Sequence, residues 1–301
     1  MIVTGLIVTS IIEKFSDKRT YESSVICESF GPAEKVSLEG YSGNAMEPFI
    51  SGDAKFLFFN SLNDGKDTSI YYAVRKDYKT FSVKGKIAGA LNGLPPHLDA
   101  VASMDAAGNF YYTTTRNYPA EFENIYTGRF MEGTVETVTA QAGNFYIKTP
   151  GWIVMDSEIS RDGTTLFFCN ARFGWGRVPL ESSLGYAVKK NSSFLTATDS
   201  VSVMKNLNGT FGYCIRYAPS ISPDGLELYY TVLNKRKYST EIYRAARKSA
   251  DKPFGIPELI RINGECPEAV TVAPDNAGIY FHMLDSGVYS IFYMKKKEAF
   301  K

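Results

Sequence analysis

Short stretches of alternating apolar and polar residues follow one another along most of the chain. A period of two is typical of half-buried β-strands, and many stretches end in paired aromatic residues, which strands favour. The apolar residues 2–12 are rich in Val, Thr and Ile, and we expect a β-strand there too. They lack the basic start and the cleavage site of a signal peptide. They are also too short for a membrane span, which needs about 20 apolar residues. The pattern predicts an all-β protein.

One segment recurs five times. Each copy starts with a small apolar stretch, passes through Ser-x-Asp-Gly or a relative of it, and ends on two aromatic residues. The copies are 47–59 (EPFISGDAKFLFF), 99–112 (DAVASMDAAGNFYY), 156–168 (DSEISRDGTTLFF), 218–230 (APSISPDGLELYY) and 269–281 (AVTVAPDNAGIYF). The last aromatic residues are separated by 53, 56, 62 and 51 residues. A near-constant interval of this size indicates a repeat architecture.

Two further strand patterns accompany each copy. One follows the aromatic pair, and another precedes the next copy at 33–38, 84–89, 136–140, 199–204 and 257–262. The Asp-Gly turn joins the first two strands, because Gly adopts positive φ freely. Units of four strands at this interval are propeller blades. We therefore expect one domain over 1–301, a five-bladed β-propeller with four-stranded blades and repeat cores near 47–72, 99–126, 156–186, 218–243 and 269–293.

The two ends of the chain leave one strand unassigned at each side. The fifth copy ends near the C-terminus without an outermost strand, whereas the strand pattern at 33–38 precedes the first copy with no unit of its own. We expect an N-terminal strand within residues 1–38 to complete the last blade and close the ring.

Residues 219–230, with the sequence PSISPDGLELYY, resemble the WD40-like (PD40) repeat of TolB-type propellers. The resemblance extends over about 250 residues. The second copy carries Asp105-Ala106-Ala107-Gly108 at the turn and the fifth carries Asp275-Asn276, so both depart from the motif. The resemblance implies a TolB-like binding platform for a ligand or a protein. It says little about activity, since propellers host many functions.

Charge and cysteine content narrow the function further. The chain has 33 Lys and Arg against 32 Asp and Glu, which gives no overall field for nucleic acid or an anionic membrane. Cys27, Cys169, Cys214 and Cys266 form no CxxC pair, so we expect free thiols, with disulfides left open for a secreted protein. The compartment is periplasmic or secreted if a signal sequence has been removed, and otherwise cytoplasmic. Nucleophile-elbow and phosphate-loop motifs are absent from the sequence.

The candidate functional residues lie where the innermost strand of each blade begins. Six residues before the Asp of each turn, equivalent positions hold Glu47, Asp99, Asp156, Ala218 and Ala269. Nearby in sequence are His97, Glu158, Arg216, Tyr217 and Glu268. These side chains either cap strand ends, form a binding funnel, or catalyse a reaction. We expect no cofactor, with calcium at Glu47, Asp99 and Asp156 as the alternative, although no Asp-x-Asp-x-Asp loop supports it.

Three carboxylates from separate blades also resemble the channel of five-bladed glycoside hydrolases of the arabinanase and levansucrase type. That resemblance implies an acid and a base drawn from Glu47, Asp99, Asp156 and Glu158, with Glu47 in the place of the first-blade base. This chain departs from that family in two ways. Those enzymes usually begin blade one with Asp, where this chain has Glu47. The residues available as the acid are Glu158 and Glu268, and neither is in register with Glu47. Such a hydrolase needs two carboxylates about 5–10 Å apart in one open pocket.

The linker at 170–184 in the third unit is longer than its counterparts and carries Arg172, Trp175 and Arg177. Extra loop on a regular scaffold is a common place for binding specificity. We interpret it either as a cover for a neighbouring blade or as an aromatic and arginine lip, extended by Trp152, for a sugar or an anionic peptide. The sequence thus predicts a propeller that binds a protein, peptide or carbohydrate at its channel mouth, with a glycoside hydrolase as the alternative.

Overall fold

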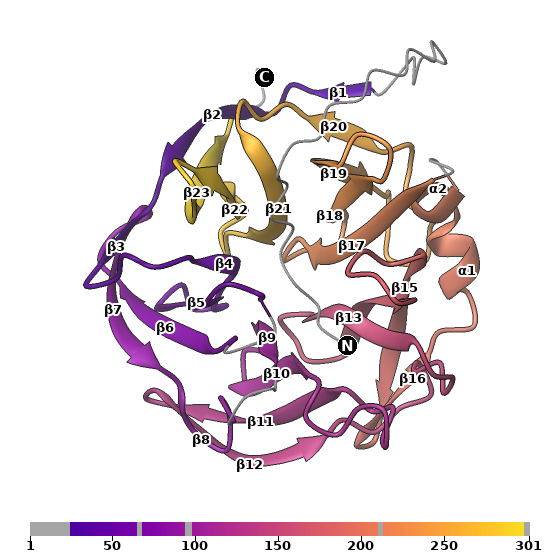
Figure 1. Cartoon of the computed structure of the whole chain (residues 1–301). Coiled ribbons are helices and arrows are strands. Elements are labelled where there is room, and N and C mark those ends of the chain that lie inside the picture. The colour runs from indigo at the N-terminus through magenta and orange to yellow at the C-terminus, as the bar shows by residue number, and fades with distance from the viewer. Residues whose placement is uncertain (1–24, 65–67, 94–97, 210–212, 298–301) are drawn as a thin grey trace.

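Five β-sheets stand radially around a central axis in the computed structural model, which describes residues 25–64, 68–93, 98–209 and 213–297 (Figure 1). Each sheet has its innermost strand at the axis, and the next three strands pair antiparallel outward. The strand predicted at 2–12 and His97 lie outside the described residues. The chain is a five-bladed β-propeller, as the repeat predicts.

The strands of each blade follow the chain from the axis to the rim. Blade one contains β4 (Met46–Ile50), β5 (Phe56–Asn60), β6 (Ile70–Arg75) and β7 (Thr80–Lys86). Blade two contains β9 (Asp99–Met104), β10 (Asn109–Thr114), β11 (Ile125–Met131) and β12 (Thr134–Ala140). Blade three contains β13 (Trp152–Ile159), β14 (Thr165–Arg172), β15 (Glu181–Lys190) and β16 (Ser193–Thr196), and blade four contains β17 (Cys214–Ile221), β18 (Glu227–Asn234), β19 (Ser239–Ala246) and β20 (Glu258–Ile260).

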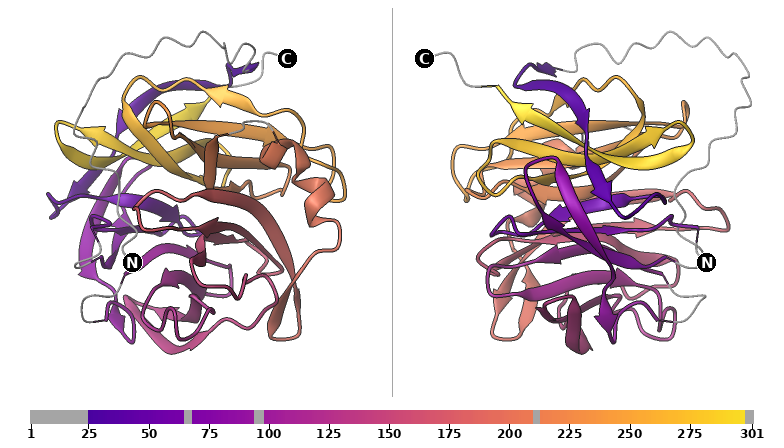
Figure 2. Two further views of the ribbon diagram at one scale, coloured as in Figure 1. Left: turned by 45° about the vertical axis from the view of Figure 1, so that its right-hand side comes forward. Right: turned by 90° about the vertical axis from the view of Figure 1, so that its left-hand side faces the viewer.

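Blade five is built from both ends of the described chain. It contains β21 (Glu265–Val272), β22 (Gly278–Asp285) and β23 (Val288–Lys296), and its rim strand is β2 (Phe30–Lys35), which pairs antiparallel with β23. The predicted closure of the ring by an N-terminal strand is therefore confirmed. This strand lies across the outside of the ring in the side views (Figure 2).

Three blades carry a fifth, short strand that the sequence did not predict. Strand β1 (Val25–Cys27) pairs parallel with β20, β3 (Ser37–Glu39) with β7, and β8 (Ala88–Gly89) with β12. The strand pattern at 33–38 is therefore divided between blades five and one. A connection that approaches the rim of a blade can pair briefly with its outer strand before it returns to the axis. Residues 25–39 thereby contact blades four, five and one.

The segment 199–204, predicted as a strand, is instead helical. Helices α1 (Ser200–Val203) and α2 (Lys205–Gly209) connect β16 to β17. Val201 and Val203 gave the impression of alternation, but Val201 is 84% exposed, and Val203, Met204 and Leu207 enter the core between blades three and four. Positions three and four apart share one face of a helix, which explains this burial.

The turn between the first two strands is shared by all five blades. Ser51, Ser160 and Ser222 each donate a backbone N–H across the turn and accept a second N–H at their hydroxyl. In blade two, Asp105 occupies this serine position, because its N–H bonds Asn109 and its carboxylate accepts the N–H groups of Ala107 and Asn109. The repeat alignment matched Asp105 to the turn aspartate of the other blades, so it shifted blade two by two residues.

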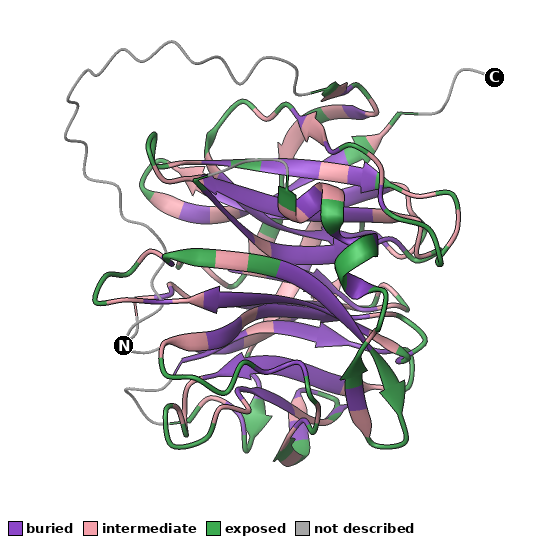
Figure 3. Cartoon of the chain, turned by 90° about the vertical axis from the view of Figure 1, so that its right-hand side faces the viewer, coloured by how far each residue is buried: buried purple, intermediate pink, exposed green. Residues whose placement is uncertain are grey.

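The buried core lies between adjacent blades, where the aromatic pairs on the second strands meet the neighbouring sheet. Phe58, Phe59, Tyr229, Tyr230 and Phe281 have no exposed surface. Burial is nearly continuous through the inner strands, whereas exposed residues lie in the loops, on helix α1 and on outer strands such as β15 (Figure 3). Within the described residues, no helix is long and apolar enough to cross a membrane. All four cysteines are free thiols.

A β-bulge interrupts each innermost strand, as the register shifts in all five blades show. Four bulges hold a non-glycine residue near φ 50°, namely Glu47 (50°), Val101 (55°), Ala218 (50°) and Ala269 (53°). A bulge re-aims side chains and leaves backbone groups without a partner in the ladder. Each bulge therefore directs side chains near the start of the innermost strand toward the channel.

A polar residue after each aromatic pair hydrogen-bonds the bulge region of the next blade. This inter-blade hydrogen bond satisfies backbone groups that the bulge releases from the ladder. The pairs are Asn60 with Val101 N–H (3.3 Å), Thr113 with Met155 C=O (3.3 Å), Cys169 with Arg216 C=O (3.1 Å), Thr231 with Ala269 N–H (3.0 Å) and His282 with Glu47 N–H (3.0 Å). The ring is thus tied at the level of the channel entrance.

Candidate functional site

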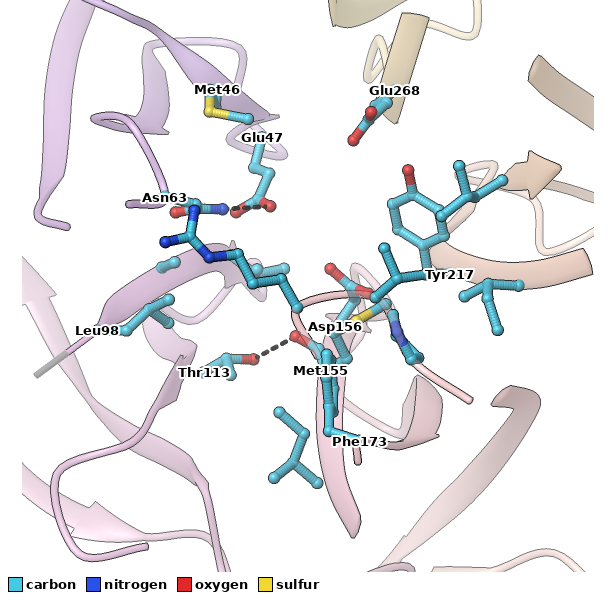
Figure 4. A pocket seen from close by; sticks show the side chains of 18 of the residues that line it. Met46, Glu47, Asn63, Leu98, Thr113, Met155, Asp156, Phe173, Tyr217 and Glu268 are labelled. Atoms are coloured by element: carbon cyan, nitrogen blue, oxygen red, sulfur yellow. Dashed lines mark hydrogen bonds between the residues drawn. The ribbon is translucent and has the colours of Figure 1, made fainter. Parts of the chain in front are cut away.

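A cavity opens in the channel at the level of the bulges, with about 730 Å³ of space not filled by protein atoms, its open mouth included (Figure 4). All five innermost strands contribute to its wall, together with the loop after β14. Much of the wall is apolar and includes Met46, Leu98, Ala100, Val101, Ile153, Met155, Phe173, Ile215 and Leu233. Three carboxylates, from Glu47, Asp156 and Glu268, interrupt this apolar surface.

Glu47 enters the cavity from the bulge of β4. Asn63 Nδ2 donates to its Oε1 at 2.8 Å, while its Oε2 is buried with no hydrogen-bond partner. Burial raises the pKa of Glu47 well above its usual range, and the negative charges of Asp156 and Glu268 raise it further. Glu47 Oε2 is therefore a hydrogen-bond acceptor left open toward the cavity.

Asp156 lies directly after the bulge of β13 and is 3% exposed. Burial raises its pKa to about 7, although a hydrogen bond from the backbone N–H of Ala218 acts in the opposite direction. Its Oδ2 is buried and has no hydrogen-bond partner. An unsatisfied carboxylate oxygen is costly, so this side chain is strongly biased toward binding a proton or a donor.

Glu268 precedes the bulge of β21 and faces the same cavity (Figure 4). Burial raises its pKa to about 7, the Tyr217 hydroxyl that hydrogen-bonds it lowers the pKa, and the charge of Asp156 raises it. The fully buried His282 lies behind, with its Nε2 3.9 Å from Glu268 Oε2. Burial lowers the pKa of His282 to about 3, so the ring is neutral, and its Nδ1 accepts the Glu47 N–H.

Within the described residues, no lysine or arginine forms an ion pair with Glu47, Asp156 or Glu268, and the neutral His282 is the basic residue that approaches Glu268. Arg177 also lines the cavity, from an exposed stretch of the loop. Within the described ranges, no three His, Cys, Asp or Glu residues are placed to hold one metal ion.

Asp99 does not join the other carboxylates. It is 1% exposed and forms an ion pair with Arg116 at 3.0 and 3.2 Å, and it also accepts the Gly93 N–H at 3.1 Å. The turn register explains this outcome, because Val101, two residues further, occupies the position equivalent to Glu47. Asp99 is therefore neutralised within blade two.

Glu158 and Arg216 are also separate from the cavity. Glu158 lines a second cavity, with Arg161 and Ser222, and accepts the Ile221 N–H at 2.8 Å and the Ser220 hydroxyl at 3.1 Å. Burial raises the pKa of Glu158 to about 8. Arg216 is 4% exposed and donates to the Cys214 carbonyl at 3.3 Å, and burial lowers its pKa.

The loop after β14 contributes to the mouth in part. Phe173, Arg177 and Pro179 line the cavity, as the lip interpretation requires. Trp175 is fully exposed and lines no part of the cavity, while Arg172 is paired with Glu181. Trp152 is half-buried at the start of β13, paired with Arg172 across the sheet.

Sequence reasoning missed two residues that shape the site. Asn63 donates a hydrogen bond that orients Glu47. His282 accepts the backbone N–H of Glu47. The signal for His282 was present, because Asn60 and Thr231 occupy the same position after an aromatic pair.

No family model and no curated protein matches the sequence. Among solved structures, the chain is similar to one described as a glycoside hydrolase, with a TM-score of 0.53 and 11% identity over 91% of this chain and 94% of that one. It is similar to BT0996 in a complex with RGII, with a TM-score of 0.52 and 12% identity over 91% and 93%. A TolB from Agrobacterium tumefaciens gives a TM-score of 0.44 and 16% identity over 82% and 72%. The first two of these likenesses establish the propeller fold and nothing finer.

Proposed function

We propose that this propeller is a binding protein that holds a small ligand, or one side chain of a larger partner, in the cavity at the channel mouth. The observation that carries the proposal is a pair of buried carboxylate oxygens, Glu47 Oε2 and Asp156 Oδ2, which face the cavity with no hydrogen-bond partner. Leaving such atoms unsatisfied costs about 1–3 kcal/mol each. A ligand that donates hydrogen bonds removes this cost, which favours binding.

The lining of the cavity supports the same function. Ligand sites are concave and mostly apolar, with a few polar groups that fix orientation. This cavity combines apolar walls with three carboxylates from separate blades. The loop with Phe173 and Arg177 forms one side of the entrance, where partner-specific contacts belong.

A cavity-filling variant tests this proposal. The side chain of Met155 points into the cavity, so Met155→Trp should occupy the space for a ligand. Met131→Trp is the matched control, since Met131 is 55% exposed on β11. Saturation-transfer NMR with mixed fragments of amines, alcohols, carboxylates and short oligosaccharides should give hits for the wild type and Met131→Trp that Met155→Trp loses. Hits retained by Met155→Trp, or no hits at all, would contradict the proposal.

A glycoside hydrolase is the second candidate. It is favoured by Asp156 and Glu268, which face one cavity with pKa values near 7, because a general acid works best with a pKa near the working pH. On this proposal one of the two protonates the leaving oxygen and a second carboxylate acts as base or nucleophile. Reducing-end release from a panel of oligosaccharides tests it. Activity should fall by at least about 100-fold in Asp156→Asn or Glu268→Gln, and no release from any substrate counts against catalysis.

A further inference from the structure

We propose that the ligand of this cavity is an organic ammonium ion, a protonated primary or secondary amine attached to an apolar body. This inference rests on the proposed binding function of the cavity and specifies its chemistry. Three features of the wall carry it: uncompensated negative charge, open hydrogen-bond acceptors, and extended apolar surface.

The charge of the cavity is the first feature. Glu47, Asp156 and Glu268 come from β4, β13 and β21 and face one space. The charges of Asp156 and Glu268 both oppose ionisation of Glu47, so the three groups are close enough to repel one another. Arg177 lies on an exposed stretch of the loop, and its charge is not among the main causes that shift the pKa values of the three carboxyls. A cationic ligand supplies the missing charge.

The hydrogen-bonding pattern is the second feature. Two neutral donors of the cavity wall are already used, since Asn63 donates to Glu47 and the Tyr217 hydroxyl bonds Glu268. Oε2 of Glu47 and Oδ2 of Asp156 stay open, and both are acceptors when ionised. An ammonium group consists of donors only, with three N–H bonds in a primary amine. It therefore complements the wall, whereas a carboxylate or phosphate ligand does not.

The apolar surface is the third feature. Ile153, Ile215 and Leu233 line the same cavity as the carboxylates, and Phe173 and Tyr217 add aromatic surface. A hydrated inorganic cation gains nothing from such walls. An alkyl or cyclic body buries apolar area there, and aromatic rings attract a neighbouring ammonium group. The wall thus favours an organic cation over a bare metal ion.

Binding of a cation should also release protons. The carboxylates that share protons near neutral pH must ionise fully to hold the ammonium group, so affinity should rise between about pH 6 and about pH 8. The titratable and charged groups at the cavity and behind its wall include Glu47 on β4, Asp156 on β13, Cys169 on β14, Arg177 in the loop, Tyr217 on β17, Cys266 and Glu268 on β21, His282 on β22 and Tyr289 on β23. Asp156 and Glu268, whose pKa values rise to about 7, change charge in this pH range.

Isothermal titration calorimetry of the full chain with three related probes tests the inference. The probes are cyclohexylmethylamine, its neutral isostere cyclohexylmethanol, and the N,N,N-trimethylated ammonium ion. At pH 8 the amine should bind at least about tenfold more tightly than the alcohol, because hydrogen bonds to charged groups contribute more. The trimethylated ion should bind more weakly than the amine, since it has no N–H donor. Equal affinity for amine and alcohol would overturn the inference.

Matched variants locate the charge that matters. Asp156→Asn and Glu268→Gln should each weaken amine binding by about tenfold or more and leave the alcohol unchanged. Glu158→Gln is the control, because Glu158 is a buried carboxylate on the same strand as Asp156 but lines a different cavity. Thermal unfolding of each variant establishes that it is folded. Equal losses in all three variants would contradict a specific role for the cavity.

The failure of this inference differs from a failure of the proposed function. If the alcohol, a sugar or calcium binds the wild type but not Met155→Trp, while the amine does not bind, the cavity is a site and the ammonium assignment is wrong. If the amine binds Met155→Trp as well as wild type, the site lies elsewhere and both proposals fail. Absence of binding for every probe at millimolar concentration also contradicts both.

Discussion

At the scale of single residues, the channel holds buried ionisable groups whose charged forms oppose folding. Asp156 and Glu268 are buried carboxyls whose pKa values rise to about 7, and His282 is a buried imidazole whose pKa falls to about 3. In each case burial favours the neutral form. Strained electrostatics of this kind often mark functional sites, where stability is given up for binding.

The pH dependence of stability in Asp156→Asn follows from this. Folding raises the Asp156 pKa from 3.8 to about 7, so ionisation destabilises the native state progressively between these pH values and fully above pH 7. The variant should be more stable than wild type by about 2–4 kcal/mol at pH 8, and the gain should shrink toward pH 4. Denaturant unfolding across pH 4–8 measures it.

The wild-type profile alone would not test this prediction. His282 has the opposite sign, since its lowered pKa gives stability that is lost as pH falls below about 6.5. Comparison of variant with wild type at each pH removes this contribution, because both contain His282. If Asp156→Asn were less stable than wild type at pH 8, the assignment of Asp156 as a strained carboxylate would be contradicted.

Residue positions were the least predictable part of the site. The repeat identified Glu47 and Asp156, with Tyr217 and Glu268 as neighbours of its ring positions, because four of the five turns kept the register. Asp99 was misplaced, since Asp105 performs the serine's role in the turn, a substitution that only the hydrogen bonds reveal. The closed pairing of Asp99 with Arg116 depends on three-dimensional contacts that a repeat alignment does not contain.

At the scale of elements, the β-bulges and inter-blade hydrogen bonds fix the entrance of every innermost strand. The sequence predicted the strands and the Asp-Gly turns, because both depend on local pattern. It did not predict the bulges, which place Val101 and Ala218 at positive φ without a glycine to signal them. The helical segment after Asp199 was missed because Val201 and Val203 mimic strand alternation.

Removal of one inter-blade acceptor should destabilise the ring. Thr231→Val leaves the Ala269 N–H without its 3.0 Å partner in a buried position, and an unsatisfied buried donor costs about 1–3 kcal/mol. Thr240→Val is the matched control, because the Thr240 hydroxyl is buried and already has no partner. Urea unfolding should show a loss for Thr231→Val only. Equal effects of the two changes would show that the inter-blade hydrogen bond contributes nothing.

At the scale of the whole molecule, the ring depends on a strand from the other end of the sequence. Strand β2 covers the outer edge of blade five, so both termini of the ring meet in one sheet. The repeat made this closure predictable, because the fifth unit lacked a strand. The three-blade contact of residues 25–39 was not predictable, since β1 and β3 are too short to give a pattern.

Two deletions separate closure from the neighbouring contacts. Deletion of residues 1–36 removes β1 and β2 and exposes an unpaired edge on β23, so cooperative unfolding should shift to lower temperature by about 5 °C or more. Deletion of residues 1–28 keeps β2 and should shift it less. Differential scanning calorimetry compares them. Equal shifts would show that β2 does not close the ring.

The measurement that tests the binding site most directly is a crystal structure of the full chain with cyclohexylmethylamine at pH 8. We expect an amine nitrogen within hydrogen-bond distance of Asp156 Oδ2 or Glu47 Oε2, with the ring against the apolar wall of the cavity. An amine bound outside the cavity, or a cavity that stays free of it at saturating concentration while the carboxylates bond one another, would contradict an ammonium site at the channel mouth.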